Sequence, residues 1–437
     1  MICLIVAGAL SLAVLRISSV TIMTPGERVL AEEHGLRWYR GNMHTHSLWS
    51  DGDDYLEGVA LWYRQNKYDF LVITDHNVLP NRERWTEVEK NKGKEIGYRR
   101  LRERFPDWVV ERKNDQGKTE VRLRTFQEVA GRLNEPGKFL LVLGEEITDS
   151  FQGIPIHMNA TNVRDLIPPQ QGESVSETIQ RNFDAVQKQR EISGQSILFH
   201  INHPNWRYCL TAEDMMRLEG GKFFEVYNGI TDMPYEGDSR HASMEKIWDI
   251  MLAHRLSDLK LPVMYGLATD DSHQYHQIPS RNDEPGRGWV MVLADKLEPK
   301  SIIDAMEQGR FYATTGVELE TIQVSDKEMR VTIREEAGVE YTVEFIGTKK
   351  NFPRDSQPAL SREGKPFRAT RRYSPEIGTV LRKFNGNWGV YEFQPDDLYV
   401  RARITSSRKH PNPSIVGEPQ RAWVQPHPGP AAASSNP

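Results

Sequence analysis

Short apolar runs alternate with stretches of helical periodicity between about residues 36 and 316. Leu56, Val59, Ala60 and Tyr63 recur at the spacing of one helix face, which predicts a helix there. The stretch "DFLVIT" that follows has an uninterrupted apolar centre, as expected for a strand buried on both faces. The stretches "FLLVLGEEIT", "SILFHINHPN", "FFEVYNG" and "PVMYGLATDDSH" share this character. Buried strands separated by helices predict an α/β fold with helices covering a parallel sheet.

Polar side chains follow these runs at the carboxyl end of each predicted strand. In chain order they are Asp75 and His76, Glu145 and Glu146, His203, Asn228, and then Asp270, Asp271 and His273. Ahead of them, His44 and His46 alternate about Thr45, so a strand would direct both rings to one face. In a closed α/β barrel, the carboxyl ends of the strands meet at one rim. The pattern therefore predicts that these distant residues meet in space.

After "SIIDAMEQGRFYATTGVE", runs of period 2 replace the helical ones. They are "KEMRVTI", "VEYTVEFIGT", "WGVYEF" and "LYVRARITSS", separated by turns with Gly, Asn and Pro. Short alternating strands of this kind predict a C-terminal antiparallel β-sandwich domain, which we place at residues 317–424. The barrel would then occupy residues 36–316, and the low-complexity residues 425–437 would form a disordered tail.

A charged insertion, residues 81–135, separates His76 from Glu146. An amphipathic helix is expected near residues 125–132 within it. The remainder fits two interpretations, a solvated flap or a lid over the site.

The chain opens with the apolar run "MICLIVAGALSLAVL", which ends at Arg16. The run is short for a membrane span and suits the core of a signal peptide. No Lys or Arg precedes it and no A-x-A-like cleavage site follows closely, so a mis-assigned start, a buried strand and helix, or a membrane anchor stays open. Residues 1–35 are interpreted as a signal peptide and N-terminal segment. The protein would then be periplasmic or secreted, and otherwise cytoplasmic.

Composition narrows the chemistry of the site. The formal net charge of -5 argues against a broad basic face for long nucleic acid. Cys3 and Cys209 are the two cysteines of the chain, which excludes a thiolate metal site and leaves His, Asp and Glu as ligands. The candidates are His44, His46, Asp51, His76, Glu146, His157, His203, Asp271 and His273. One divalent ion needs fewer ligands, so a site of two or three ions is expected, with Glu146 suited to bridge them.

Five motifs in order carry a resemblance to a known family. They are "HTHSLWSDG", "TDHN", "GEEIT" followed by "HMNA", "NHP" and "TDDSH", spread between Arg40 and Gly316. In this order they resemble the PHP (polymerase and histidinol phosphatase) family, in the branch with phosphoesterase-like and carbaryl-hydrolase-like metallohydrolases. The resemblance implies a distorted (β/α)7 TIM-like barrel and two or three ions of manganese, zinc or iron.

The resemblance also implies that the nine candidates above are the metal ligands. It favours Glu146 over Glu145 from a G-x-E-I pattern, and His203 over His200 because Pro204 follows. Asp271 is favoured over Asp270 by its D-x-H spacing to His273. The residues not chosen would orient the ligand rings through hydrogen bonds.

The expected activity is metal-dependent hydrolysis, most simply of a phosphate ester. The substrate would be a small phosphorylated compound or a short oligonucleotide, the latter cleaved as by a 5'-3' exonuclease. His203, His273 or His200 would protonate the leaving oxygen, and Arg207 and Arg287 are candidates to clamp a phosphate or to form surface salt bridges. The same ions could instead activate water against a carbamate, ester or amide. A third reading is a binding protein with an inactive barrel.

Overall fold

The computed structural model describes residues 28–30 and 35–433. The apolar run interpreted as an export signal lies outside the described residues. Within the described ranges, no helix combines the length and the apolar character that crossing a membrane would require.

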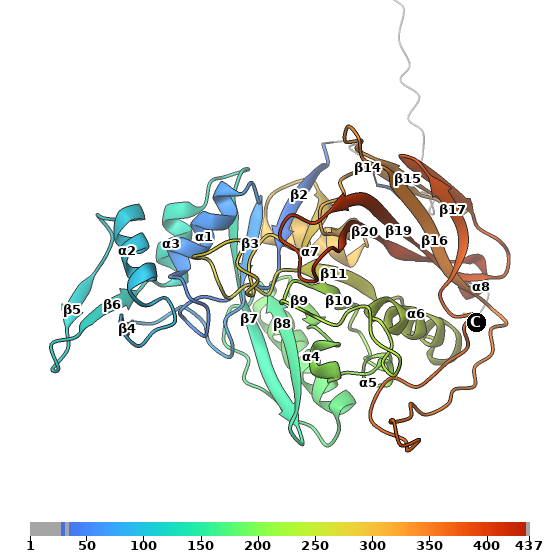
Figure 1. The fold of residues 1–437 in the computed structure, drawn as a ribbon, viewed down its shortest axis with the longest axis horizontal. Helices are drawn as coiled ribbons and strands as arrows, with labels where there is room; N and C mark the ends of the chain where they lie inside the picture. Colours follow the sequence, from blue (N-terminus) through green and yellow to red (C-terminus); the bar gives the residue numbers. More distant parts are fainter. Residues whose placement is uncertain (1–27, 31–34, 434–437) are drawn as a thin grey trace, which may run out of the picture.

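The α/β part of the chain carries most of the helices (Figure 1). Its elements are β1 Arg28–Leu30, β2 Arg37–Asn42, α1 Leu56–Gln65, β3 Phe70–Ile73, β4 Arg84–Glu87, α2 Lys94–Arg104, β5 Glu111–Lys113, β6 Thr119–Leu123, α3 Phe126–Leu133, β7 Leu140–Phe151, β8 Ile154–Thr161, α4 Val175–Ser193, β9 Leu198–Ile201, η1 Trp206–Tyr208, α5 Ala212–Met215, β10 Phe223–Asn228, α6 Met244–His254, the π-helix η2 Arg255–Leu259, β11 Tyr265–Thr269, β12 Trp289–Ala294, α7 Pro299–Glu307 and β13 Phe311–Thr314. The helix predicted from Leu56 and the strands predicted from the apolar runs are confirmed. Each of these elements forms at the residues where it was predicted, because the apolar side chains of the pattern are buried against neighbouring elements.

The later elements are mainly strands, as the period-2 runs predict. They are β14 Leu319–Val324, β15 Glu328–Ile333, β16 Tyr341–Lys349, β17 Thr379–Asn385, β18 Trp388–Glu392, β19 Asp397–Lys409, β20 Pro419–Pro428 and α8 Pro430–Ala433. The expectation of a disordered tail from residue 425 was wrong for its first part. β20 continues to Pro428 because it pairs with β19, where Val400 lies opposite His427.

The largest sheet in the described part of the chain has 13 strands in the order β11-β10-β9-β8-β7-β3-β2-β12-β13-β20-β19-β16-β17. β2, β3 and β7 run parallel, as do β9, β10 and β11, whereas β8 is antiparallel to both β7 and β9. No strand ladder joins β11 to β2 among the described residues. The segments that follow β2 and β11 meet through an isolated bridge between Thr45 and Ser272. The fold is thus a mixed α/β sheet that curls toward closure, and a closed barrel is not confirmed.

The C-terminal strands belong to the same sheet. β13 pairs with β20, so the sheet passes without interruption across the domain boundary expected at residue 316. A second sheet, in the order β1-β14-β15-β18, shares an apolar core with it that includes Ile322, Val331, Val343 and Phe345. The two sheets therefore share one apolar core, but the larger sheet is continuous with the α/β part, and a separate β-sandwich domain is not confirmed.

A buried ion-pair network fastens α6 to β19. Asp249 accepts hydrogen bonds from the Arg401 Nε at 2.8 Å and from the Tyr399 hydroxyl at 2.8 Å. Arg401 is 1% exposed, and a second carboxylate, Glu245, lies 2.9 Å from it. The free energy of unfolding depends on these ion pairs, because removing the carboxylate of Asp249 would leave the buried guanidinium of Arg401 without one of its two acidic partners.

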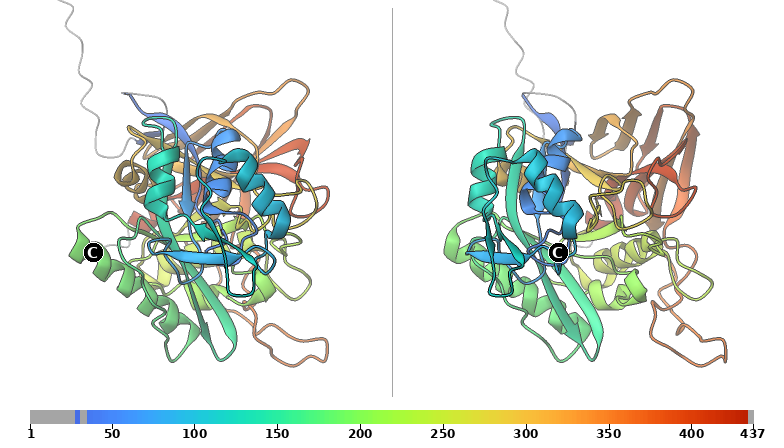
Figure 2. Two further views of the ribbon diagram at one scale, coloured as in Figure 1. Left: turned by 90° about the vertical axis from the view of Figure 1, so that its left-hand side faces the viewer. Right: turned by 60° about the vertical axis from the view of Figure 1, so that its left-hand side comes forward.

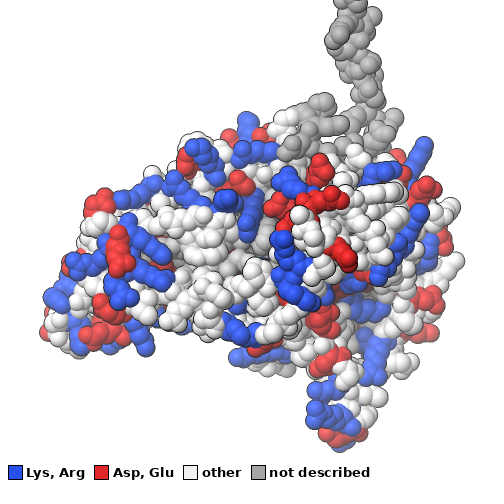
Figure 3. All heavy atoms as spheres, turned by 45° about the horizontal axis from the view of Figure 1, so that its top comes forward, with Lys and Arg blue, Asp and Glu red and all other residues white. Residues whose placement is uncertain are grey.

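The insertion folds as a packed unit at one end of the molecule (Figures 1 and 2). Its antiparallel sheet has the order β4-β6-β5 and is accompanied by α2 and α3. Leu101, Phe105 and Val121 join the core that contains Tyr55 and Leu56 of the α1 region. The surface of this end carries acidic and basic side chains interspersed (Figure 3). The expected helix near residues 125–132 is α3, begun by a capping box of Thr125 and Glu128.

Glu57 on α1 makes stability depend on pH. Its side chain is 2% exposed and Oε2 has no hydrogen-bond partner among the described residues, so burial raises the pKa of this carboxyl to about 7. A raised carboxyl pKa gives stability that is complete below the unfolded value of 4.5 and is lost as pH rises through 7. We expect Glu57→Gln to increase the free energy of unfolding at pH 8 by at most about 3 kcal/mol, and to change it little at pH 4.

Urea unfolding at the two pH values measures this difference. Glu103→Gln, at an exposed position on α2, is the control and should change the free energy of unfolding little at either pH. A Glu57→Gln variant that is less stable than the parent at pH 8 would contradict the interpretation.

Candidate metal centre

The nine candidate ligands come from six strands of the large sheet, or the residues just after them, and from one loop. His44 and His46 follow β2, His76 follows β3, Glu146 lies on β7, His157 on β8, His203 follows β9, Asp271 and His273 follow β11, and Asp51 lies in the loop before α1. The Thr45 hydroxyl donates to the Val72 carbonyl oxygen at 2.7 Å, which turns Thr45 away from its two neighbours. The rings of His44 and His46 therefore lie on one side, with centroids 5.2 Å apart.

Glu146 is at the centre of the cluster and is 1% exposed. Its Oε2 lies 3.4 Å from His44 Nε2, 3.3 Å from His46 Nε2 and 2.8 Å from His76 Nδ1. Its Oε1 lies 3.1 Å from His157 Nδ1 and 3.5 Å from His203 Nε2. One carboxylate thus faces five imidazoles, and both are donor types that hold divalent ions in proteins.

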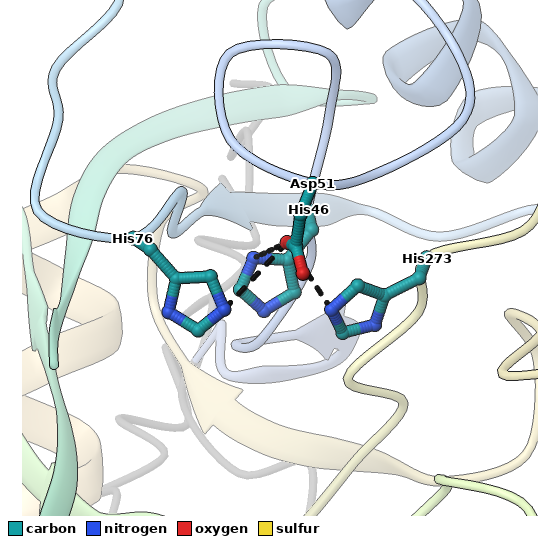
Figure 4. Close-up of side chains that lie close together, drawn as sticks. All are labelled: His46, Asp51, His76 and His273. Carbon is teal, nitrogen blue, oxygen red and sulfur yellow. Dashed lines mark ion pairs between the residues drawn. The ribbon is translucent and has the colours of Figure 1, made fainter. Parts of the chain in front are cut away.

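Asp51 and Asp271 complete the arrangement on either side of His46. Asp51 Oδ1 lies 3.3 Å from His273 Nε2 and 3.6 Å from His76 Nε2, and Figure 4 shows the rings of His46, His76 and His273 turned toward this carboxylate. Asp271 Oδ1 lies 3.0 Å from His46 Nε2 and 3.2 Å from His44 Nε2. The carboxylates are therefore interleaved with the imidazoles.

The electrostatics of the cluster favours positive charge. Burial alone would lower the pKa of His44, but the carboxylates of Asp271, Glu146 and Glu225 raise it well above its usual value. Against the same opposing effect of burial, Asp51 and Asp271 raise the pKa of His273 to about 9. Burial and the nearby His273 ring lower the pKa of His46 to about 3, which leaves its ring neutral. The ionised carboxylates thus stabilise positive charge on His44 and His273, and divalent ions would supply such positive charge more effectively.

The donor atoms fit such ions. Glu146 Oε2 and His44 Nε2 are buried, face each other at 3.4 Å and take part in no hydrogen bond with the described residues. All nine candidates fall into groups whose donor atoms lie within 4.8 Å of one another. The groups within this set are His46, Asp51, His76 and His273; His44, His203 and Asp271; His44, His46 and Glu146; and His76, Glu146 and His157. Imidazole and carboxylate donors suit zinc, manganese or iron.

The neighbouring acids that the sequence left as alternatives point elsewhere. Glu145 accepts a hydrogen bond from the backbone N–H of Ile167 at 2.9 Å, and burial raises its pKa to about 8. Asp270 accepts from the backbone N–H groups of Gly286, Arg287 and Gly288. These carboxyls hold loops in place, and Glu146 and Asp271 are the ones that face the cluster.

Glu225 on β10 is a functional candidate that the sequence analysis missed. Its Oε1 lies 2.7 Å from His44 Nδ1 and accepts from the Thr269 hydroxyl at 2.8 Å. A carboxylate bonded to one ring nitrogen fixes the tautomer and leaves the other nitrogen free for a metal ion. A lone acid within the apolar run "FFEVYNG" was the available signal. His200 lies beside it, with its Nε2 3.6 Å from Glu225 Oε1.

A pocket of about 270 Å³ opens over the cluster. It is lined by Asp51, His76, Lys92, Glu146, His157, His203, Trp206, Ile230, Asp271, His273, Gln274 and Asp283. Of the three histidines expected to donate a proton, His203 and His273 line it, whereas His200 is fully buried and does not. His200 therefore does not fit contact with a substrate.

The two arginines expected as clamps differ in position. Arg287 is fully buried and donates to the Gly229 carbonyl oxygen and the Thr231 hydroxyl, so it does not fit the role of a phosphate clamp. Arg207 is exposed, with its guanidinium 4.5 Å from the Trp206 ring centroid. Arg207 is adjacent to a pocket residue, and its predicted role stays a prediction.

No family model and no curated protein matches the chain. Among solved structures, the chain is similar to a two-domain Bacteroides vulgatus protein described as containing a predicted PHP-like metal-dependent phosphoesterase. The identity is 16%, the TM-score 0.39, and the match covers 92% of this chain and 99% of that one. The family indicated by the sequence motifs therefore reappears in this neighbour's description.

Two further similar structures have TM-scores of 0.29. One, from Bifidobacterium adolescentis, is described provisionally as a metal-dependent phosphoesterase, at 13% identity and 56% and 92% coverage of the two chains. The other is an amidohydrolase from Chromobacterium violaceum, at 12% identity and 62% and 96% coverage. At these identities and TM-scores the likenesses carry no argument about the reaction, which has to come from the side chains.

Proposed function

We propose that the protein is a metal-dependent hydrolase that cleaves phosphate esters. The observation that carries the proposal is Glu146, which lies within 3.5 Å of five imidazoles at the floor of an open pocket. Two or three divalent ions would be held by the nine clustered residues, with Glu146 shared between ions. When bound, such ions lower the pKa of a water molecule and stabilise charge on phosphoryl oxygens.

The residues of the chain then have distinct tasks. Glu225 would hold the His44 ring with its Nε2 toward Glu146 and Asp271. Trp206 and Ile230 would shield one side of the pocket from water. In hydrolysis, a bond forms between water oxygen and phosphorus, the phosphorus–leaving-oxygen bond breaks, and the leaving oxygen takes a proton. His203 and His273 line the pocket, and whichever of the two is not ligating an ion is the candidate to supply that proton.

A substrate panel on the purified protein tests the proposal. We expect bound zinc, manganese or iron by mass spectrometry, and turnover of p-nitrophenyl phosphate or bis(p-nitrophenyl) phosphate above that of aryl carbamates and acetates. The His44→Ala variant should lose its bound metal and also its turnover, because the His44 ring lies beside the carboxylates of Glu146 and Asp271. Exclusive turnover of carbamates, esters or amides would show a carbonyl hydrolase on the same residues. Well under one ion per chain, without turnover, would favour a binding protein.

A further inference from the structure

The insertion reaches the pocket through Lys92, in the turn between β4 and α2. Its Nζ lies 3.5 Å from Asp51 Oδ2, and its side chain is 54% exposed. Among the described residues that line the pocket, Lys92 is the one Lys or Arg. Every other side-chain charge in the lining comes from Asp, Glu or His.

Close backbone packing fixes the position of Lys92. A Cβ on Gly93 would lie 2.2 Å from the carbonyl oxygen of Asp53, and one on Gly97 would lie 3.3 Å from the same atom. The two glycines thus let the start of α2 rest on the loop that carries Asp51. On its other side, Arg100 donates to the His276 carbonyl oxygen at 2.6 Å, close to the segment that carries His273. The turn and the helix α2 therefore pack against two loops, the one that carries Asp51 and the one that carries His273.

The charge of Lys92 discriminates between substrate classes. An ammonium group in a pocket has no partner on a neutral carbamate or acetate, whereas it forms charge-assisted hydrogen bonds with phosphate oxygens. A phosphomonoester carries close to two negative charges at neutral pH, and a diester carries one. The volume of about 270 Å³ suits a small molecule with a terminal phosphate better than a long chain.

We infer that Lys92 binds a non-bridging oxygen of a small phosphomonoester, so that the insertion selects a terminal phosphate over diesters and neutral esters. This inference rests on the proposed function and adds the substrate class. It also assigns the insertion a part in the site, beyond that of a solvated flap.

Lys92→Met removes the charge and keeps most of the length of the side chain. We expect the KM for p-nitrophenyl phosphate and the Kd for inorganic phosphate, measured by calorimetry on the metal-loaded protein, to rise roughly 10- to 100-fold. Turnover of bis(p-nitrophenyl) phosphate should change much less, and the metal content should not change. Lys92→Arg should restore most of the phosphate affinity.

The control is Lys90→Met, two residues earlier in the same turn, where Nζ pairs with Glu87 at 2.8 Å. Lys90→Met should leave the KM for p-nitrophenyl phosphate, the Kd for inorganic phosphate, the turnover of bis(p-nitrophenyl) phosphate and the metal content near the parent values. If the parent hydrolyses p-nitrophenyl phosphate and Lys92→Met leaves KM and Kd unchanged, the role of Lys92 is wrong and the function stands. Loss of bound metal from Lys92→Met would also overturn the inference about Lys92. The lysine would then act by positioning Asp51, one of the candidate metal ligands, and not by binding phosphate. A parent protein that neither hydrolyses phosphate esters nor binds phosphate would overturn the proposed function itself.

Discussion

Replacing Glu146 with glutamine is expected to remove bound metal and reduce kcat/KM by at least about a thousandfold. The amide keeps the size of the side chain but loses the negative charge that five imidazoles face within 3.5 Å. Charge stabilisation by bound ions is worth several kcal/mol in such sites, and each 1.4 kcal/mol is about a factor of ten in rate. Metal content by mass spectrometry and steady-state kinetics measure the two effects together.

The neighbouring residue offers a matched control. Glu145→Gln makes the same chemical change one position earlier, where the side chain faces the backbone of Ile167, and the amide oxygen can still accept that hydrogen bond. It should keep its ions and its turnover to within a few-fold. If Glu146→Gln kept both and Glu145→Gln lost both, the strand would present the opposite face to the site.

The second large effect concerns stability. Asp249→Ala is expected to lower the free energy of unfolding by about 3–5 kcal/mol, because it leaves the guanidinium of Arg401 buried without its main partner. The reason for this magnitude is the desolvation of Arg401, which is 1% exposed. Equilibrium unfolding in urea at pH 7 measures the change.

Asp165→Ala is the comparison, since Asp165 pairs with Arg164 where both side chains are more than half exposed. A surface pair of this kind contributes about 0–1 kcal/mol, so the variant should unfold close to the parent. Equal effects from the two substitutions would mean that Glu245 alone satisfies Arg401.

Sequence patterns were sufficient to predict the elements whose apolar positions match the faces that the fold buries. The buried strands β3, β9, β10 and β11 appear as apolar runs because neighbours cover both of their faces. The polar residues just after them fall in the site because parallel strands end at a common edge. β8 escaped this reasoning, since it returns antiparallel from the long β7 strand and brings His157 into the cluster from within a strand.

The residues that sequence reasoning missed or misplaced depend on contacts between distant segments. Glu225 lies in an apolar run, and only the fold places His44 beside it. In the sequence, Lys92 is one of several lysines in a charged insertion. Only the packing of Gly93 and Gly97 against the loop that carries Asp51 places it beside the pocket. Arg287 has the chemistry of a phosphate clamp, but the fold turns its donors toward Gly229 and Thr231.

Pairing of β13 with β20 determines how the protein can be shortened. Ending the polypeptide at residue 316 would leave β13 paired with β12 alone, remove its other hydrogen-bonded partner β20, and uncover the apolar side of Tyr312, which is now fully buried. Such an open edge is a template for intermolecular strand addition. Expression of residues up to 316 alone should thus give insoluble material, and any transplant of the candidate metal centre into another scaffold has to carry the C-terminal strands with it.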